Sequence, residues 1–426
     1  MKIAVAGLWH LGSVTAACLA NAGHTIIAYD PDPETINQLQ QNQAPIFEPG
    51  LSDLLSTQTI DFTSDLHHLT PADIVWITFD TPVDDHDIAD VEQVRQAIIH
   101  IFPYLQKNTL VLISSQLPVG STRQLQQLCT STYPEKNITF AYSPENLRLG
   151  KAIEVFTQPE RIVIGIQSET DKAKLEKLLH PFTQNIIYMS IESAEMTKHA
   201  LNAFLATSVV FINELATLCE QVGASAREVE IGLKSEARIG SKAYLRPGNA
   251  IAGGTLARDV NYLIQMAQQQ SIKTPLFSAI IDSNHAHKQW SCQKIQTILK
   301  DLRNKTITTL GLTYKAGTDT LRRSAAVETC QWLSEQGAKM IAYDPSLSQL
   351  PDEISQFIEL KTTLADALNN SDAIIIATEW PEFNTLSADD LITSIKQPCV
   401  FDPGGFLAKT LGNDARVRYF SVGRTS

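Results

Sequence analysis

The chain has 426 residues, of which 43% are hydrophobic and 19% are charged, so it is long enough to form two or three domains with separate cores. Its formal net charge of -12 and isoelectric point near 5.3 disfavour nonspecific binding to phosphate backbones, and we expect no nucleic-acid partner. No apolar run approaches the roughly 18 residues of a membrane span, and the N-terminus is typical of a strand rather than a signal peptide. We therefore predict a cytoplasmic protein without a membrane partner.

The six cysteines are scattered without CxxC pairs, and most lie in apolar helix or strand patterns. They are Cys18, Cys129, Cys219, Cys292, Cys330 and Cys399. Cysteine behaves as a small hydrophobic residue in such surroundings, so we interpret all six as buried thiols of a reducing compartment. We predict no metal site.

Short apolar runs alternate with helical patterns in the first part of the chain and again in the last part. The expected strands are 2–6, 25–29, 74–78, 109–114, 139–142 and 161–164, and then 306–312, 339–343, 373–377 and 398–401. This alternation predicts α/β domains with doubly wound parallel sheets. We place two Rossmann-like domains at residues 1–190 and 301–426.

The middle of the chain, residues 191–300, is predicted to be all-helical. Apolar residues recur close to every 3.6 positions from Ser193 to Val222, which predicts a long connecting helix with more than one buried face, ending at Gly223. Further helices are expected over 255–270 and 278–302. Because such a region can supply a dimer surface, we expect a homodimer.

The turn after the first strand has the form of a dinucleotide-binding fingerprint. Two glycines bracket the turn, and Asp30 ends the second strand about 20 residues further on, where an acid binds ribose hydroxyls. An acid there favours NAD over NADP, because it would repel a 2′-phosphate. Trp9 replaces the middle glycine, so its side chain must point away or occupy space that the cofactor would use. The turn residues predicted to contact NAD are Gly7, Trp9, His10, Leu11 and Gly12.

Eight further motifs follow one another along the chain. They are PIFEPGL at 45–51, TP at 81–82, LPVG at 117–120, SPENLR at 143–148, residues 194–206, RIG at 238–240, residues 311–319, and TEWPEF at 378–383. Each motif alone is weak evidence for a family, but chance agreement of all eight in the same order along the chain is implausible. Together they resemble the UDP-glucose/GDP-mannose dehydrogenase family over nearly the whole chain.

The resemblance implies an N-terminal NAD domain, a helical dimerisation region and a C-terminal domain for the diphosphate of a nucleotide sugar. Enzymes of this family oxidise the C6 alcohol of the sugar to a carboxylate with two NAD, and a cysteine thiolate captures the intermediate aldehyde. Residues 378–383 and 343–345 look more like the UDP-sugar branch than the GDP-sugar branch, which is an analogy.

The resemblance also assigns roles to individual residues. Lys198 and Asn202, spaced i, i+4 on one helix face, look like the pair that steadies the developing C6 alkoxide. Glu145 resembles an acid or base, and Asp259 resembles a carboxylate that orders water or supports the lysine. Alternatively, Asp259 only complements the dipole of a first helical turn. The remaining cofactor contacts would be Thr81, Gln116 and Arg258, and the substrate contacts Asn146, Leu147, Arg148, Arg238, Tyr244, Gly253, Lys315 and Arg322.

Thr255 stands where the family has its catalytic cysteine. A threonine hydroxyl is a poor nucleophile near neutral pH without a dedicated base, and Thr255 also suits the N-cap of a following helix, which is the interpretation we favour. We therefore expect the first hydride transfer to remain and the second oxidation to be impaired or rerouted. Two alternatives stay open: a nucleotide-sugar-binding pseudoenzyme, and a redox-neutral enzyme that retains NAD, such as an epimerase.

Overall fold

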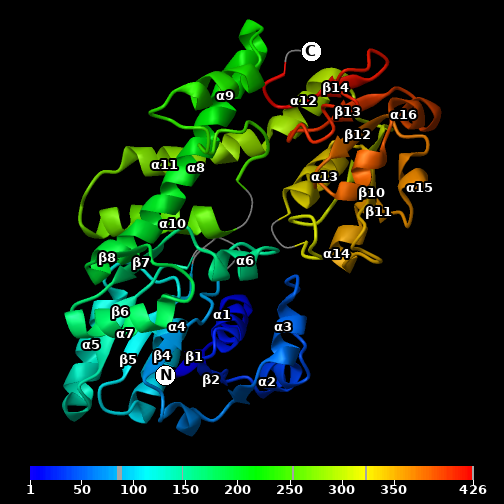
Figure 1. The fold of residues 1–426 in the computed structure, drawn as a ribbon. Coiled ribbons are helices and arrows are strands. Elements are labelled where there is room, and N and C mark those ends of the chain that lie inside the picture. Colours follow the sequence, from blue (N-terminus) through cyan, green and yellow to red (C-terminus); the bar gives the residue numbers. More distant parts are fainter. Residues whose placement is uncertain (84–88, 146, 252–253, 322–323, 425–426) are drawn as a thin grey trace. The chain divides into compact units, whose positions relative to one another are not determined.

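The computed structural model describes the chain except residues 84–88, 146, 252–253, 322–323 and 425–426 (Figure 1). It divides into two compact units, Met1–Leu201 and Asn202–Ser426. Each unit contains one β-sheet covered by helices on both faces, so the predicted α/β class with two Rossmann-like sheets is confirmed.

The first unit contains an eight-stranded sheet of order β3-β2-β1-β4-β5-β6-β7-β8. The strands are β1 (Lys2–Ala6), β2 (Thr25–Tyr29), β3 (Ile60–Thr63), β4 (Ile74–Ile77), β5 (Leu110–Ile113), β6 (Thr139–Tyr142), β7 (Ile162–Gly165) and β8 (Ile186–Met189). Neighbouring strands are parallel except β6 and β7, which meet antiparallel at Tyr142 and Gly165. The prediction of a parallel sheet is thus wrong at this one pairing, because an apolar run does not reveal strand direction.

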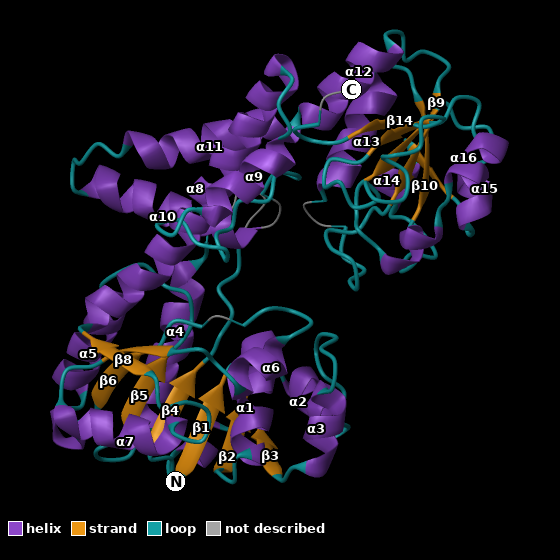
Figure 2. Cartoon of the chain, turned by 45° about the horizontal axis from the view of Figure 1, so that its top comes forward, coloured by secondary structure: helices purple, strands orange, loops and turns teal. Residues whose placement is uncertain are grey.

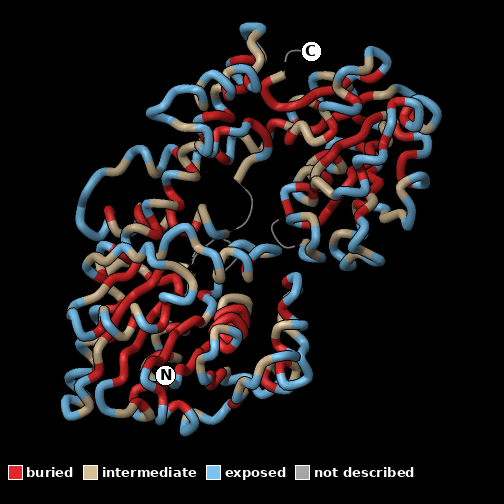
Figure 3. The backbone as a smooth tube through the Cα atoms, viewed as in Figure 1, coloured by how far each residue is buried: buried red, intermediate tan, exposed pale blue. Residues whose placement is uncertain are grey.

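Alternate residues of the central strands contribute to two cores on opposite faces of this sheet, and the central strands are buried along most of their length (Figure 3). Ile3 and Val5 pack on one face, and Ala4 and Ala6 on the other, as the two-residue period of a strand requires. The first face is covered by α1 (His10–Asn21), α2 (Pro33–Gln40), α3 (Leu51–Thr57), α6 (Ala152–Thr157) and α7 (Glu169–Leu179). The second is covered by α4 (Val91–Ile101), α5 (Ser121–Thr132) and the start of α8 (Ile191–Val222).

Helix α8 ends before Gly223, whose φ of 78° is readily adopted by glycine, so the predicted long helix is confirmed. By length and composition alone it could cross a membrane, and it is the one helix among the described residues that could. Its apolar residues contribute to three cores instead, including one that Ala203, Ala206 and Val210 form with α10 (Gly254–Gln269) and α11 (Pro275–Lys288).

The helical segment continues with α9 (Ala226–Ser235), α10, α11 and α12 (Trp290–Leu299). The single helix expected over 278–302 is two helices, because α11 ends at Lys288 and α12 begins at Trp290, with Gln289 as the capping residue of both.

The second unit contains a six-stranded parallel sheet of order β11-β10-β9-β12-β13-β14 (Figure 2). Its strands are β9 (Thr306–Leu310), β10 (Lys339–Tyr343), β11 (Ile358–Leu360), β12 (Ala373–Ile376), β13 (Cys399–Phe401) and β14 (Arg418–Phe420). Its helices are α13 (Ala325–Glu335), α14 (Asp352–Ser355), α15 (Leu364–Leu368) and α16 (Ala388–Ser394).

Candidate functional site

The turn after β1 requires both of its glycines. Gly7 has φ of 97°, and a Cβ there would lie 2.6 Å from the backbone of Phe79. A Cβ on Gly12 would lie 1.7 Å from the carbonyl oxygen of Gly7. This close approach of the α1 N-terminus to the strand is the geometry that presents backbone amides to a pyrophosphate.

Asp30 lies beside this turn, directly after β2. Its Oδ2 accepts a hydrogen bond from the amide of Leu8 at 2.7 Å, and its Oδ1 accepts one from the amide of Asp32 at 3.0 Å. Burial raises the pKa of the Asp30 carboxyl, although both hydrogen bonds oppose the rise. A carboxylate with few protein donors retains lone pairs for ligand hydroxyls, so the turn and Asp30 fit the ribose and pyrophosphate of NAD.

Trp9 does not distort the turn. Its φ of -68° is ordinary for any residue, and 47% of the residue is exposed. The backbone therefore does not need glycine at position 9, and the indole points at least partly to solvent. Leu11 is half-buried at the start of α1.

Two further predicted cofactor residues meet beyond neighbouring strands. Thr81 follows β4 and donates its hydroxyl to the carbonyl oxygen of Gln116, beyond β5, at 2.8 Å. Both residues are buried. Since β1 and β4 are neighbours and the strand order reverses between them, these residues follow the carboxyl ends of strands at which open α/β sheets bind ligands.

The structure brings Lys198 and Glu145 together. The buried Lys198 Nζ donates to the carbonyl oxygen of Glu145 at 2.6 Å and lies 3.6 Å from its Oε1. Glu145 Oε2 in turn accepts the amide of Leu147 at 2.7 Å. Arg148 is exposed, and the predicted contact Asn146 lies outside the described residues.

In the second unit, the side-chain amide of Asn202 on α8 donates to Asp259 Oδ2 on α10. Asp259 is fully buried, and Arg258 beside it is buried as well. Helix α10 begins at Gly254, so Asp259 lies beyond its first turn. The alternative that Asp259 merely complements a helix dipole is therefore wrong, because the carboxylate pairs with a neighbouring helix.

Thr255 is the second residue of α10 and is exposed. The N-cap interpretation of Thr255 is wrong, because the helix already includes the residue before it. Gly253, a predicted substrate contact, lies outside the described residues.

No cysteine offers a replacement nucleophile. All six cysteines of the chain lie among the described residues, and all are buried and unpaired, as predicted. Burial raises the pKa of Cys18 and Cys330 to about 12 and that of Cys129, Cys292 and Cys399 to about 11, so these thiols stay protonated near neutral pH.

Within the described part of the chain, no group of three or more His, Cys, Asp or Glu side chains could hold a metal ion.

The turn after β9 in the second unit has the same hydrogen bonds as the turn after β1 in the first unit. The amide of Gly7 donates to the carbonyl oxygen of Tyr29 at 2.9 Å, and the amide of Gly311 donates to the carbonyl oxygen of Tyr343 at 2.8 Å. The next residue in each turn donates to the acid after that tyrosine: Leu8 to Asp30 at 2.7 Å, and Leu312 to Asp344 at 2.8 Å. Sequence reasoning used residues 343–345 only as a sign of the UDP-sugar branch and gave Asp344 no role, although the Tyr-Asp pair that ends the second strand of each sheet was the available signal.

Asp30 and Asp344 differ in how many hydrogen bonds they accept from the protein and in the direction of their pKa shifts. Burial opposes ionisation of Asp344, but hydrogen bonds from Thr313, Ser346 and Leu312 outweigh it and lower its pKa. The Asp30 carboxyl has a raised pKa and fewer donors. Asp344 therefore holds the second turn together, whereas Asp30 is the acid with capacity for a ligand.

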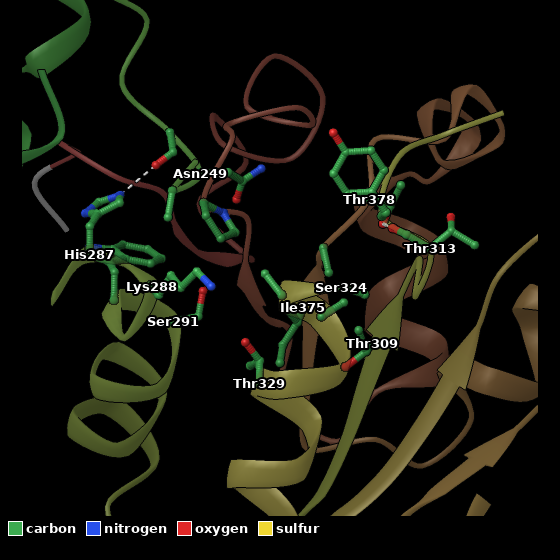
Figure 4. Close-up of a pocket in the computed structure, with 18 residues that line it drawn as sticks. Asn249, His287, Lys288, Ser291, Thr309, Thr313, Ser324, Thr329, Ile375 and Thr378 are labelled. Atoms are coloured by element: carbon green, nitrogen blue, oxygen red, sulfur yellow. Dashed lines mark hydrogen bonds between the residues drawn. The ribbon is translucent and has the colours of Figure 1, made fainter. Parts of the chain in front are cut away.

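A pocket lies beside the second turn (Figure 4). It lies beyond β9 and β12, between which the strand order reverses, and His287 on its wall donates Nε2–H to the carbonyl oxygen of Gly248 at 2.7 Å. Its lining includes one lysine and seven hydroxyl side chains: Lys288, Ser291, Thr309, Thr313, Tyr314, Ser324, Thr329 and Thr378. The ammonium of Lys288 is a suitable donor to a diphosphate. The hydroxyls of Thr313, Ser324 and Thr378 instead donate to acceptors within the protein. Sequence reasoning assigned none of these residues to the substrate. Thr313 and Thr378 lie within quoted motifs, whereas Lys288, Ser291 and Thr329 carry no motif.

The remaining predicted substrate residues are mostly exposed. Lys315 is exposed and follows the pocket residue Tyr314. Tyr244 is exposed on the wall of a second pocket, which also contains Arg246 and Glu379. Arg238 is exposed and pairs with Glu236 at 3.0 Å, and Arg322 lies outside the described residues.

Comparison with known families matches three successive models of one family. Residues 1–183 match the NAD binding domain of the UDP-glucose/GDP-mannose dehydrogenase family. Residues 192–286 match its central domain and residues 308–409 its UDP binding domain.

Relatives and solved structures agree with these matches. The chain is 34% identical to a UDP-glucose 6-dehydrogenase of Rhizobium meliloti (strain 1021), over 100% of both proteins. It is 34% identical to one of Bacillus subtilis (strain 168), over 100% of this chain and 98% of the relative. The structure of a UDP-glucose dehydrogenase from Pyrobaculum islandicum has a TM-score of 0.82 and 26% identity over 91% of each chain. The chain therefore belongs to the UDP-glucose/GDP-mannose dehydrogenase family.

Proposed function

We propose that this protein is an NAD-dependent dehydrogenase that oxidises the C6 alcohol of a UDP-hexose. The observation that carries the proposal is the buried Lys198, whose ammonium is fixed on the Glu145 loop at 2.6 Å. A buried, oriented cation stabilises a developing alkoxide more strongly than a solvated one. The dinucleotide turn and Asp30 support NAD as the cofactor, as does the family's NAD binding domain.

The chain's own residues would prepare the alcohol for oxidation. Bound NAD supplies the hydride acceptor. Lys198 uses one donor on the Glu145 carbonyl oxygen and has others to polarise the sugar oxygen. Glu145 is half-buried beside the ammonium and is placed to accept a proton. The hydrogen bond to Asp259 would hold the side-chain amide of Asn202 in place, so that this amide and Lys198 could both bind the alkoxide.

The second oxidation is proposed to be impaired or rerouted. Thr255 offers a hydroxyl where the family has a thiol, and every cysteine of the chain is buried. A neutral hydroxyl captures an aldehyde poorly, so any carboxylate would form through a hydrate whose water is ordered by Glu145 or Asp259.

We propose that the substrate carries UDP rather than GDP. Support comes from the family's UDP binding domain at 308–409 and from relatives named UDP-glucose 6-dehydrogenases. In this assignment residues 1–190 bind NAD, residues 191–300 contribute to catalysis and dimerisation, and residues 301–426 bind the nucleotide sugar. The pocket proposed for the diphosphate is also lined by Lys288 and Ser291 of the helical region.

We also propose a homodimer. Phe204, Phe211, Leu218 and Val222 of α8 are 71%, 50%, 62% and 75% exposed. Their spacings of seven, seven and four residues place them along one side of the helix. An exposed apolar stripe of this length is typical of a covered interface. Sedimentation of the protein should give a dimer and that of Phe211→Glu a monomer, whereas a monomeric parent would refute the assignment.

The catalytic proposal is tested by incubating the protein with NAD and a panel of UDP- and GDP-hexoses, following reduced cofactor by absorbance. The expected result is NADH formation with a UDP-hexose and a smaller rate with GDP-mannose. Nucleotide binding by calorimetry without NADH from any sugar would instead show a binding protein. NAD that copurifies and stays oxidised during epimerisation of the sugar would show a redox-neutral enzyme.

A further inference from the structure

The carboxylate of Glu48 joins three separated segments of the first unit. It is buried, and its Oε1 accepts the amide of Ala152 at 2.8 Å. Its Oε2 accepts the amide of Gly150 at 2.8 Å and lies 2.9 Å from His10 Nε2. A buried carboxylate is stable only when donors satisfy its oxygens, so these three contacts define where Glu48 lies.

One of these segments belongs to the cofactor turn. His10 is the first residue of α1 and directly follows Trp9. Its Nε2–H donates a hydrogen bond to the Glu48 carboxylate, because an ionised carboxylate can only accept. The position of the α1 N-terminus, at which the pyrophosphate would bind, is therefore tied to Glu48.

Another segment belongs to the proposed substrate loop. Gly150, with φ of 86°, and Ala152 lead from this loop into α6, and the amide of Lys151 between them donates to the carbonyl oxygen of Arg148 at 2.9 Å. Three residues before Arg148, the carbonyl oxygen of Glu145 accepts the ammonium of Lys198. The C-terminal end of the loop that orients Lys198 is thus anchored on Glu48.

We infer that His10 is a positioning residue for the substrate loop, acting through Glu48, in addition to lying in the cofactor turn. This inference rests on the proposed function. It predicts that loss of the His10 donor weakens nucleotide-sugar binding and turnover, because Glu48 would no longer fix the loop relative to α1.

The first test compares His10→Phe, which keeps an aromatic ring without the donor, with His10→Gln, whose Nε2 can reach Glu48. Calorimetry would give Kd for UDP-glucose and for NAD separately, and kinetics would separate kcat from KM. For His10→Phe we expect about tenfold weaker UDP-glucose binding and a lower kcat, as for loss of a hydrogen bond to a charged group. His10→Gln should bind UDP-glucose more tightly than His10→Phe, because its side-chain amide restores a donor to Glu48. His100→Phe, on the exposed end of α4, is the matched control.

The second test is a double-mutant cycle with Glu48→Gln. If His10 acts through Glu48, the effects of His10→Phe and Glu48→Gln on UDP-glucose affinity are less than additive. Near-ultraviolet circular dichroism would establish that the variants fold, and if Glu48→Gln does not fold, the comparison of His10→Phe with His10→Gln decides alone. An unchanged Kd for UDP-glucose in His10→Phe, with only NAD binding weakened, would overturn the inference and leave the proposed function intact. A parent that binds neither ligand would overturn both.

Discussion

The amide of Asn202 and the carboxylate of Asp259 are paired inside the second unit, although 57 residues separate them in the sequence. Both residues are buried, and they join α8 to α10 at the helix that carries Thr255. The pair therefore has a structural role as well as the proposed catalytic one.

Removing either side chain should destabilise the protein by about 1–3 kcal/mol, because the other loses this hydrogen bond while it stays buried. The Asn202→Ala/Asp259→Ala double variant should lose less than the sum of the single losses, since one interaction is lost only once. Urea unfolding of the four proteins measures this, with Asp282→Ala on an exposed position of α11 as the control. Additive losses would show that the two side chains do not depend on each other.

Lys198→Met should lower kcat/KM by about 10²-fold or more, because methionine fills similar volume without the charge that stabilises the alkoxide. The variant should remain folded and bind UDP-glucose with an affinity near that of the parent. Steady-state kinetics and calorimetry measure the two effects, and Lys177→Met on the exposed face of α7 is the matched control. A fall in affinity with kcat unchanged would assign Lys198 to substrate binding alone.

Trp9 should report cofactor binding. Its indole is half exposed beside the dinucleotide turn, so bound NADH should quench its emission, and Trp9→Phe should remove most of that change among the five tryptophans of the chain. Because the backbone at position 9 is unstrained, Trp9→Gly should alter Kd for NAD by less than about threefold. A large gain in NAD affinity for Trp9→Gly would mean that the indole occupies cofactor space.

His287 should make stability depend on pH. Burial lowers the pKa of His287, although its hydrogen bond to Gly248 opposes the change. The unfolded chain therefore binds a proton below about pH 6.5 that the folded chain does not, and stability falls as the pH drops through this value and levels off below the folded pKa. The free energy of unfolding, measured in urea from pH 8 to pH 5, should fall less steeply in His287→Gln. Equal slopes in the two proteins would show that His287 titrates normally.

Thr255→Cys should increase the fraction of product that is carboxylate, because a thiol at the exposed start of α10 can capture an aldehyde. Thr255→Ser keeps a hydroxyl and should behave like the parent. Mass spectrometry of the sugar products measures the ratio. If Thr255→Cys yields no additional carboxylate, more than the nucleophile differs from the family pattern.

The sequence predicted the centre of each sheet and missed its edges. The strands absent from the prediction are β3, β8, β11 and β14, and they are the four edge strands. Each has three or four residues and is partly exposed. A charged residue interrupts β3, β11 and β14, so these three do not form the continuous apolar run of a buried parallel strand. Strand β8 is apolar throughout, but it has only four residues.

The candidate site was predictable only where a motif carries it. The Gly7 turn and Asp30 follow from spacing, and the separate roles of Lys198 and Glu145 were implied by family resemblance, although their contact was not. The Asn202–Asp259 pair, the Glu48 junction and the hydroxyl-lined pocket join residues that are distant in sequence, and only tertiary packing shows that they meet. The sequence predicted Thr255 as the N-cap, just before the helix, because two glycines followed by a threonine are typical of a helix start. In the structure α10 already begins at Gly254.

The number of NADH molecules formed per UDP-hexose consumed, measured by absorbance together with the mass of the sugar product, tests the central claim most directly. An NAD-dependent dehydrogenase with an impaired second step should give close to one NADH per sugar and an aldehyde or its hydrate. Two NADH per sugar with a carboxylate formed at an undiminished rate would contradict the role given to Thr255, and no NADH from any sugar would contradict the proposed activity itself.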